Sequence, residues 1–201
     1  MIIGKAAKCS LFLCLHLNAK PVMFNLFKKK EAPIRIIDKI WMSEKAKWNG
    51  LLEQWKKNPD LVLITWFDTT LHQLETFFAK ETSTPVSLYN AREMHRPQLA
   101  GRQLIFAEHH PMRKKEQELF MQWQLSEAVV YSSMDEPLFQ KFGGEKIIQL
   151  MKQLGMPEEG VIEHKMISRS IENAQEKIEK KVTTEHIASS QQQWMERNLP
   201  G

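Results

Sequence analysis

Residues 61–67 read LVLITWF, seven residues that are all apolar or β-branched and carry no charge. Continuous runs of this kind are typical of strands covered on both faces, as in a parallel sheet. Asp68 and Thr69 follow directly and are predicted to cap a helix. The inward stripe of that helix is expected to consist of Leu71, Leu74 and Phe78. A buried strand that leads straight into a helix favours an α/β fold.

Four more strand candidates flank this run along the chain. They are residues 34–41, 85–89, 104–107 and 128–131, which are rich in apolar and β-branched residues. Ser43 is predicted to cap a helix whose single buried stripe is made of Trp48, Leu51, Leu52 and Trp55. Another helix is expected over residues 112–123, with Leu119, Phe120 and Trp123 inward. Strands that alternate with such helices indicate an α/β fold with a mainly parallel sheet and right-handed crossovers.

The sequence changes character after Ser133. Residues 137–154 are predicted to be helical, with a bend near Gly143-Gly144. A long helix is expected from Lys165 to at least Lys181, with an apolar stripe formed by Ile167, Ile171, Ala174, Ile178 and Val182. We expect this helix to fold back on its own domain and not to form a coiled-coil dimer. The polar residues beyond Thr183 are predicted to fray.

Composition and charge describe an ordinary globular chain. It has 201 residues, a net charge of +4 and a pI near 9.0. Lysines and glutamates alternate on most predicted helices, which disfavours nucleic acid as a partner because its binding needs one-sided basic clustering. The compact basic run is Lys28 to Lys30. Cys9 and Cys14 form no disulfide framework, so a cytoplasmic location is expected.

The first 22 residues are unusual. The apolar run from Ser10 to Leu17 is too short to span a membrane. Met23 opens the sequence MFNLFKKK, a plausible natural start. The hypothesis is that residues 1–22 are an upstream over-extension of the reading frame, and N-terminal sequencing of the native protein tests it.

Motifs for autonomous chemistry are missing from the sequence. There is no Gly-x-x-x-x-Gly-Lys-Ser/Thr phosphate loop, which argues against ATP hydrolysis by this chain alone. The densest polar cluster, Glu108-His109-His110, follows a predicted strand, where α/β domains place ligands. Adjacent histidines point in different directions and no full ligand set is visible, so neither a metal nor another cofactor is expected. His164 is interpreted as a capping or packing residue at a helix start.

Residues 143–182 resemble the segment of SecA, the preprotein-translocase ATPase, that leaves the second motor domain and begins the long scaffold helix. The matching motifs, in the family's order and spacing, are Phe142-Gly143, Lys146-Ile147, Leu154-Gly155-Met156, Ile162-Glu163-His164, Ser170-Ile171, Ala174-Gln175 and Lys177. The resemblance is strong over residues 128–182, moderate over residues 104–119 and weak over residues 34–103. It implies a RecA-like, P-loop NTPase-type sheet of the helicase C-terminal kind.

The departures from SecA concern its chemistry. The family's arginine-finger segment corresponds here to residues 120–127, which hold neither arginine nor glycine. Ala100-Gly101-Arg102 resembles another family motif but lies before a strand, so its role is not carried over. The first motor domain with its phosphate loop has no counterpart. Arg113, in the helix that matches the family, is the one residue that could serve a nucleotide in trans.

The resemblance implies three parts and three readings of function. Residues 1–30 are an N-terminal extension, residues 31–135 a degenerate RecA-like domain and residues 136–201 a helical extension. The first reading is a bacterial pseudo-ATPase, a non-catalytic interaction module whose partner is SecA or the translocon, with peripheral membrane association open and no transmembrane segment expected. The second is a half-site that completes an ATPase with a separate P-loop domain. The third is a helicase-derived nucleic-acid binder.

Overall fold

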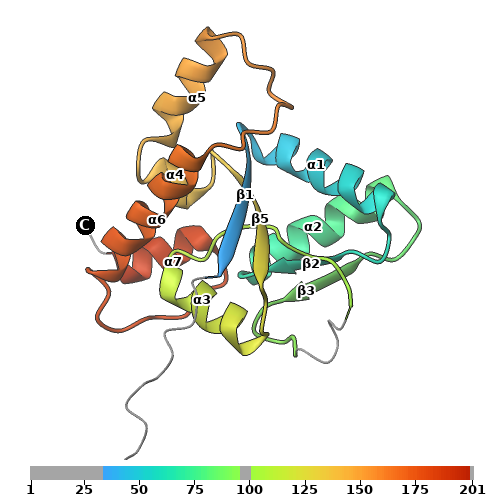
Figure 1. Cartoon of the computed structure of the whole chain (residues 1–201), viewed down its shortest axis with the longest axis horizontal. Helices are drawn as coiled ribbons and strands as arrows, with labels where there is room; N and C mark the ends of the chain where they lie inside the picture. The colour runs from blue at the N-terminus through green and yellow to red at the C-terminus, as the bar shows by residue number, and fades with distance from the viewer. Residues whose placement is uncertain (1–33, 96–100, 200–201) are drawn as a thin grey trace, which may run out of the picture. The chain divides into compact units, whose positions relative to one another are not determined.

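The computed structural model describes residues 34–95 and 101–199, which belong to one compact unit (Figure 1). The proposed start at Met23, the two cysteines and the basic run at residues 28–30 lie outside the described residues. So does Ala100, whereas Gly101 and Arg102 are described.

The described residues form a five-stranded sheet in which every neighbouring pair is parallel. The strands are β1 (Arg35–Trp41), β2 (Val62–Thr65), β3 (Ser87–Asn90), β4 (Leu104–Phe106) and β5 (Glu127–Ser133). Their order across the sheet is β1-β5-β4-β2-β3. All four residues of β2 are buried, as the unbroken apolar run predicts for a central strand. The predicted parallel α/β fold is confirmed.

Helices cover both faces of the sheet (Figure 1). On one face lie α1 (Glu44–Lys57) and α2 (Asp68–Glu81), which bury Leu51, Trp55, Leu74 and Phe78. Ser43 caps α1 as predicted, because its hydroxyl accepts a hydrogen bond from the Ala46 backbone N–H at 3.3 Å. On the other face lies α3 (Arg113–Gln122), with α4, α6 and α7 of the helical extension.

The helical extension after β5 contains α4 (Pro137–Gln140), α5 (Gly144–Gln153), α6 (Lys165–Glu179) and α7 (Gln191–Asn198). The predicted interruption near Gly143 is confirmed, since Gly143 has φ of +90°, a conformation that favours glycine. The long helix α6 ends at Glu179, two residues before the predicted Lys181. It packs against α3 of the same unit, so the predicted fold-back is confirmed. Ile162 makes two backbone hydrogen bonds with Ile40 of β1, at 2.7 and 3.2 Å.

The prediction that residues beyond Thr183 fray is wrong. The segment folds into α7, and Trp194 has no exposed surface. Ser190 caps the helix through a hydrogen bond from the Gln193 backbone N–H at 3.0 Å. Apolar residues are sparse here, but Ala188, Trp194 and Met195 all join the main core. Burial of one tryptophan outweighs the polar composition of the segment.

Across residues 34–95 and 101–199, no helix combines the length and the apolar character that crossing a membrane requires.

Candidate functional site

The carboxyl edge of the sheet contains the point at which the chain reverses its direction of winding. From β2 the chain passes through α2 to β3 on one side, whereas from β4 it passes through α3 to β5 on the other. Because β2 and β4 are neighbours, the segments that leave them diverge at their carboxyl ends. Ligands of open α/β sheets bind at such switch points. Here the two segments are residues 66–68 and residues 107–110.

Glu108 fills the anion position at this switch point. Its Oε1 accepts hydrogen bonds from the backbone N–H groups of Trp66 at 2.9 Å and Phe67 at 3.0 Å, and its Oε2 accepts from the Thr70 hydroxyl at 2.8 Å. These donors lie at the N-terminus of α2, which is where a phosphate or carboxylate is favoured. The position is therefore taken by a carboxylate of the chain itself.

The predicted capping of α2 by Asp68 and Thr69 is wrong. Asp68 is the first helical residue, and Phe67 in the N-cap position offers no side-chain oxygen. The Asp68 carboxylate instead accepts a hydrogen bond from the Asn90 side chain at 2.6 Å. Glu108, distant in sequence, provides the acceptor that a local cap would otherwise supply. A long-range contact thus replaces the local one that the sequence pattern predicts.

Burial changes the acidity of Glu108. Loss of solvent is the main cause and raises the pKa of this carboxyl to about 7. The charge of Lys47 and the hydrogen bonds from Thr70 and Phe67 lower the pKa but do not offset the effect of burial. The side chain of Lys47 is 1% exposed, and its Nζ donates to Glu136 Oε1 at 2.7 Å and to the Ala107 carbonyl at 3.0 Å. Burial lowers the pKa of Lys47, but the Glu136 carboxylate more than offsets this and the net change is upward.

His109 lies between two buried carboxylates. Its Nε2 is 3.0 Å from Asp38 Oδ1 and its Nδ1 is 2.9 Å from Glu116 Oε1. Burial alone would lower the pKa of His109, but the two carboxylates raise it to about 10. A protonated ring then donates from both nitrogens. Asp38 belongs to β1 and Glu116 to α3, so this triad ties the edge strand to the helix across the sheet.

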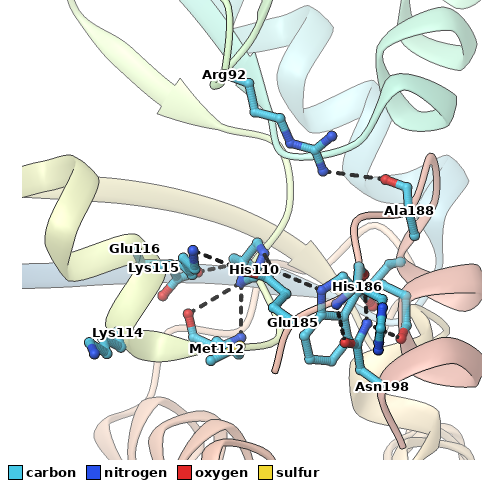
Figure 2. A network of polar contacts seen from close by, with 12 residues as sticks. Arg92, His110, Met112, Lys114, Lys115, Glu116, Glu185, His186, Ala188 and Asn198 are labelled. Atoms are coloured by element: carbon cyan, nitrogen blue, oxygen red, sulfur yellow. Dashed lines mark hydrogen bonds and ion pairs between the residues drawn. The ribbon is translucent and has the colours of Figure 1, made fainter. Parts of the chain in front are cut away.

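His110 joins α3 to the last segment of the chain. Figure 2 shows its ring between the start of α3 and the segment that carries Glu185. His110 Nε2 is 3.3 Å from Glu185 Oε1, and Glu185 also pairs with Lys115 at 3.0 Å and accepts from the Trp194 indole at 3.0 Å. The pKa of Glu185 is held well below its usual range, and the hydrogen bond from His110 is the largest cause. Burial acts in the opposite direction but is outweighed.

Two glutamine side chains of the helical extension donate hydrogen bonds to backbone carbonyls at this edge of the sheet. The Gln175 amide on α6 donates to the His110 carbonyl at 2.8 Å and to Glu116 Oε2 at 3.0 Å. The Gln191 amide on α7 donates to the His109 carbonyl at 3.0 Å. The carboxyl edge is therefore covered by the extension as well as filled by its own side chains.

The structure separates the two histidines of the predicted cluster, as expected from their adjacency. The ring of His109 turns to Asp38 and Glu116, while that of His110 packs against Trp66, Phe67 and Trp194. Within the part of the chain that the structure describes, no group of three histidine, cysteine or acidic side chains could hold a metal ion. His164 is the N-cap of α6, where its Nδ1 accepts from the Met166 backbone N–H at 3.2 Å, so its predicted capping role is confirmed.

Arg113 lies at the start of α3 and is engaged within the chain. Its guanidinium is 2.8 Å from Glu172 Oε1 on α6, and its side chain is 18% exposed. The arrangement joins α3 to α6 and leaves the guanidinium close to the surface.

Sequence reasoning missed most of this network. Asp38, Lys47 and Glu116 are each 8% exposed or less. A signal exists for Asp38, because it is the one acidic residue of the strand RIIDKIW and lies between Ile37 and Lys39 in the middle of that strand. For the other two no local pattern distinguishes them from charged residues on a solvated helix face. Their partners are between 6 and 89 residues away in the chain.

The fold and this edge define a RecA-like α/β module whose ligand position is occupied by the protein's own carboxylate. Comparison with known proteins relates one segment of the chain to SecA. The protein translocase subunit SecA of Acinetobacter baumannii (strain ATCC 17978) is 36% identical over 86 residues, and SecA 1 of Chlorobium chlorochromatii is 37% identical over 86 residues. SecA of Oleidesulfovibrio alaskensis is 38% identical over 87 residues.

The shared segment is a minor part of each protein. It covers 41% of this chain, and 10%, 8% and 10% of the three SecA proteins, respectively. The chain therefore spans about a tenth of the length of the curated relatives it matches. No protein-family model matches the chain.

Proposed function

We propose that this chain is a non-catalytic, SecA-related interaction module that acts beside a protein translocase. The observation that carries the proposal is the position of Glu108 on the backbone N–H groups of Trp66 and Phe67. A nucleotide phosphate at this helix N-terminus would have to displace a fully buried carboxylate and break three hydrogen bonds. Where Glu108 is ionised, above about pH 7, the phosphate would also add a second like charge to a buried site, which is strongly unfavourable.

The similarity to SecA supports the link with protein export. The relatives are translocase subunits by name, and the shared segment is 36–38% identical. Such a module would bind SecA or the translocon through its surface, at the cytoplasmic side of the membrane, without adding a phosphate loop.

The proposal is tested with purified proteins. The full chain is mixed with SecA from the same cells, complex formation is followed by sedimentation, and ATP hydrolysis is measured for each protein alone and for the mixture. We expect no hydrolysis by the chain alone, a stable complex and a changed rate for SecA. Hydrolysis by the chain alone would exclude a non-catalytic module, and absence of a complex would exclude the link to SecA.

The same experiment addresses the half-site reading. Arg113 would have to leave Glu172 in order to reach a nucleotide held by another protein. We therefore expect the R113A chain to affect the rate of ATP hydrolysis by SecA as much as the wild-type chain does. The control is R102A, which removes an arginine outside α3 and should behave in the same way. A selective loss of the effect in R113A would favour completion of an ATPase in trans.

A further inference from the structure

Exposed apolar side chains concentrate on one lobe of the described residues. This lobe, defined as residues 142–166, holds seven of the ten large hydrophobic side chains that are exposed among residues 34–95 and 101–199. The most exposed are Leu154 and Met166, both at 71%. Monomeric soluble proteins rarely leave large contiguous apolar patches open to water, so this concentration indicates an interface.

The helix at the centre of the lobe, α5, buries little of its surface within the described residues. Gly144 is the single fully buried residue of α5, a helix of ten residues. Isolated helices of that length are marginal in water. Ile148 and Met151 pack partly against the main core. A neighbouring stripe, formed by Ile147 and Leu150 with the C-cap residue Leu154, is exposed and follows the 3-and-4 spacing that packs into a partner helix.

The surface beside this stripe also has room for an inserted side chain. A cavity of about 80 Å³ lies between α5 and α6 and is lined by Phe142, Ile147 and Ile171, among others. Helix packing places side chains of one helix into such holes of the other.

Charge on the lobe is divided between its two parts. On α5, Lys146 and Lys152 outnumber Glu145, whereas residues 155–163 carry Glu158, Glu159 and Glu163 and no basic residue. Lys146, Lys152, Glu158 and Glu159 are exposed, and no salt bridge within the described residues engages them. A two-fold axis through the lobe sets α5 of one copy against the acidic segment of the other. The lobe is thus complementary in charge to itself, which is the requirement of an isologous contact.

We propose that a second copy of this chain covers the lobe, forming a two-fold homodimer through α5 and residues 155–163. The apolar stripe provides the buried centre of the contact, and the lysines and glutamates provide its rim. This inference does not depend on the proposed function, because it concerns α5 and not the carboxyl edge of the sheet.

Sedimentation equilibrium of the full chain at micromolar concentration tests the proposal. We expect a mass of twice the 23.6 kDa of one chain. L154E is expected to raise the dissociation constant at least about 100-fold, because an unpaired carboxylate would be buried at the contact. The control I187E alters a residue that is 67% exposed outside the lobe, and it should remain dimeric. Both substitutions are at exposed positions, and a single cooperative thermal transition shows that each variant folds, although loss of the dimer is expected to lower the melting temperature of L154E.

Reversing the charges on α5 or on residues 155–163 tests whether these two segments face each other in the dimer. K146E/K152E and E158K/E159K should each weaken self-association, while an equimolar mixture of the two should restore a dimer that contains one of each. A monomeric wild type, a dimer that persists in L154E, or a mixture that fails to associate would each overturn the proposal. A monomeric wild type that binds SecA and loses this binding in L154E would instead assign the lobe to that protein.

Discussion

At the scale of single residues, the carboxyl edge depends on ionisable side chains that are buried and paired. Glu108, His109 and Lys47 all lie within the core, where an unpaired charge is strongly unfavourable. Each has an ionised or amide partner from a different element. The edge can therefore be tested by removing one partner at a time.

The pKa values of His109 and Glu108 predict how stability varies with pH. His109 has a folded pKa of about 10 against 6.5 for the free side chain, so its stabilising effect is complete below pH 6.5 and is lost as pH rises towards 10. Glu108 holds its proton up to about pH 7 in the folded state, against 4.5 when free, so its effect declines between those values. Both groups predict a melting temperature that falls as pH rises.

Thermal unfolding of wild type and H109Q between pH 6.5 and 10 measures this effect. We expect the wild-type melting temperature to fall across the range and the slope to be much smaller in H109Q. H72Q is the matched control, since His72 is on the surface and pairs with Glu75 within α2. A wild-type profile that is flat across this range would contradict a buried, charged His109.

Loss of the Lys47 charge should lower the free energy of unfolding, and a second substitution at Glu136 should recover part of the loss. K47M leaves the Glu136 carboxylate buried without its cation, and breaking such pairs costs about 3–5 kcal/mol. The double variant K47M/E136Q removes both charges and keeps an acceptor for the Ser133 backbone N–H, which now bonds Glu136 at 2.9 Å. We expect urea unfolding to show K47M/E136Q as more stable than K47M. Additive losses in the double variant would show that the two side chains do not interact.

At the scale of elements, sequence patterns predict the strands of the sheet well, but they miss the last helix and the cap of α2. The five strands are found because their apolar runs are short, continuous and separated by helices with one apolar stripe. The helix α7 is missed because its burial rests on one tryptophan among polar residues. The cap of α2 is missed because its acceptor, Glu108, follows a strand 38 residues away from Thr70. Periodicity reports local structure, whereas these contacts depend on the topology.

The last helix should be part of the cooperative core. Trp194 contacts His110 with ring centroids 5.7 Å apart, and its indole N–H donates to Glu185. W194A is therefore expected to reduce the free energy of unfolding by about 3–5 kcal/mol. W66F provides a milder comparison, because the Trp66 indole nitrogen has no hydrogen-bond partner in the described residues. Unchanged stability of W194A in urea would show that α7 does not pack as described.

At the scale of the whole molecule, the chain combines a complete parallel sheet with a switch point closed by its own side chains. The parallel pairing of all five strands and the helices on both faces are consistent with a RecA-like module. The helical extension covers the carboxyl edge through Gln175 and Gln191. The sequence resemblance predicts the loss of nucleotide chemistry from missing motifs. That loss stays a prediction, and the position of Glu108 at the N-terminus of α2 supports it.

The most direct test of the account is equilibrium binding of Mg-ATP to the wild-type chain, followed through the backbone amide signals of Trp66 and Phe67 by NMR. The account predicts no shift of either signal at millimolar nucleotide, because both N–H groups already bond Glu108. In E108A the two groups are released, so inorganic phosphate should shift their signals in that variant alone. Saturable shifts of both signals in the wild type would show that a nucleotide displaces Glu108, and would contradict a closed, non-catalytic edge.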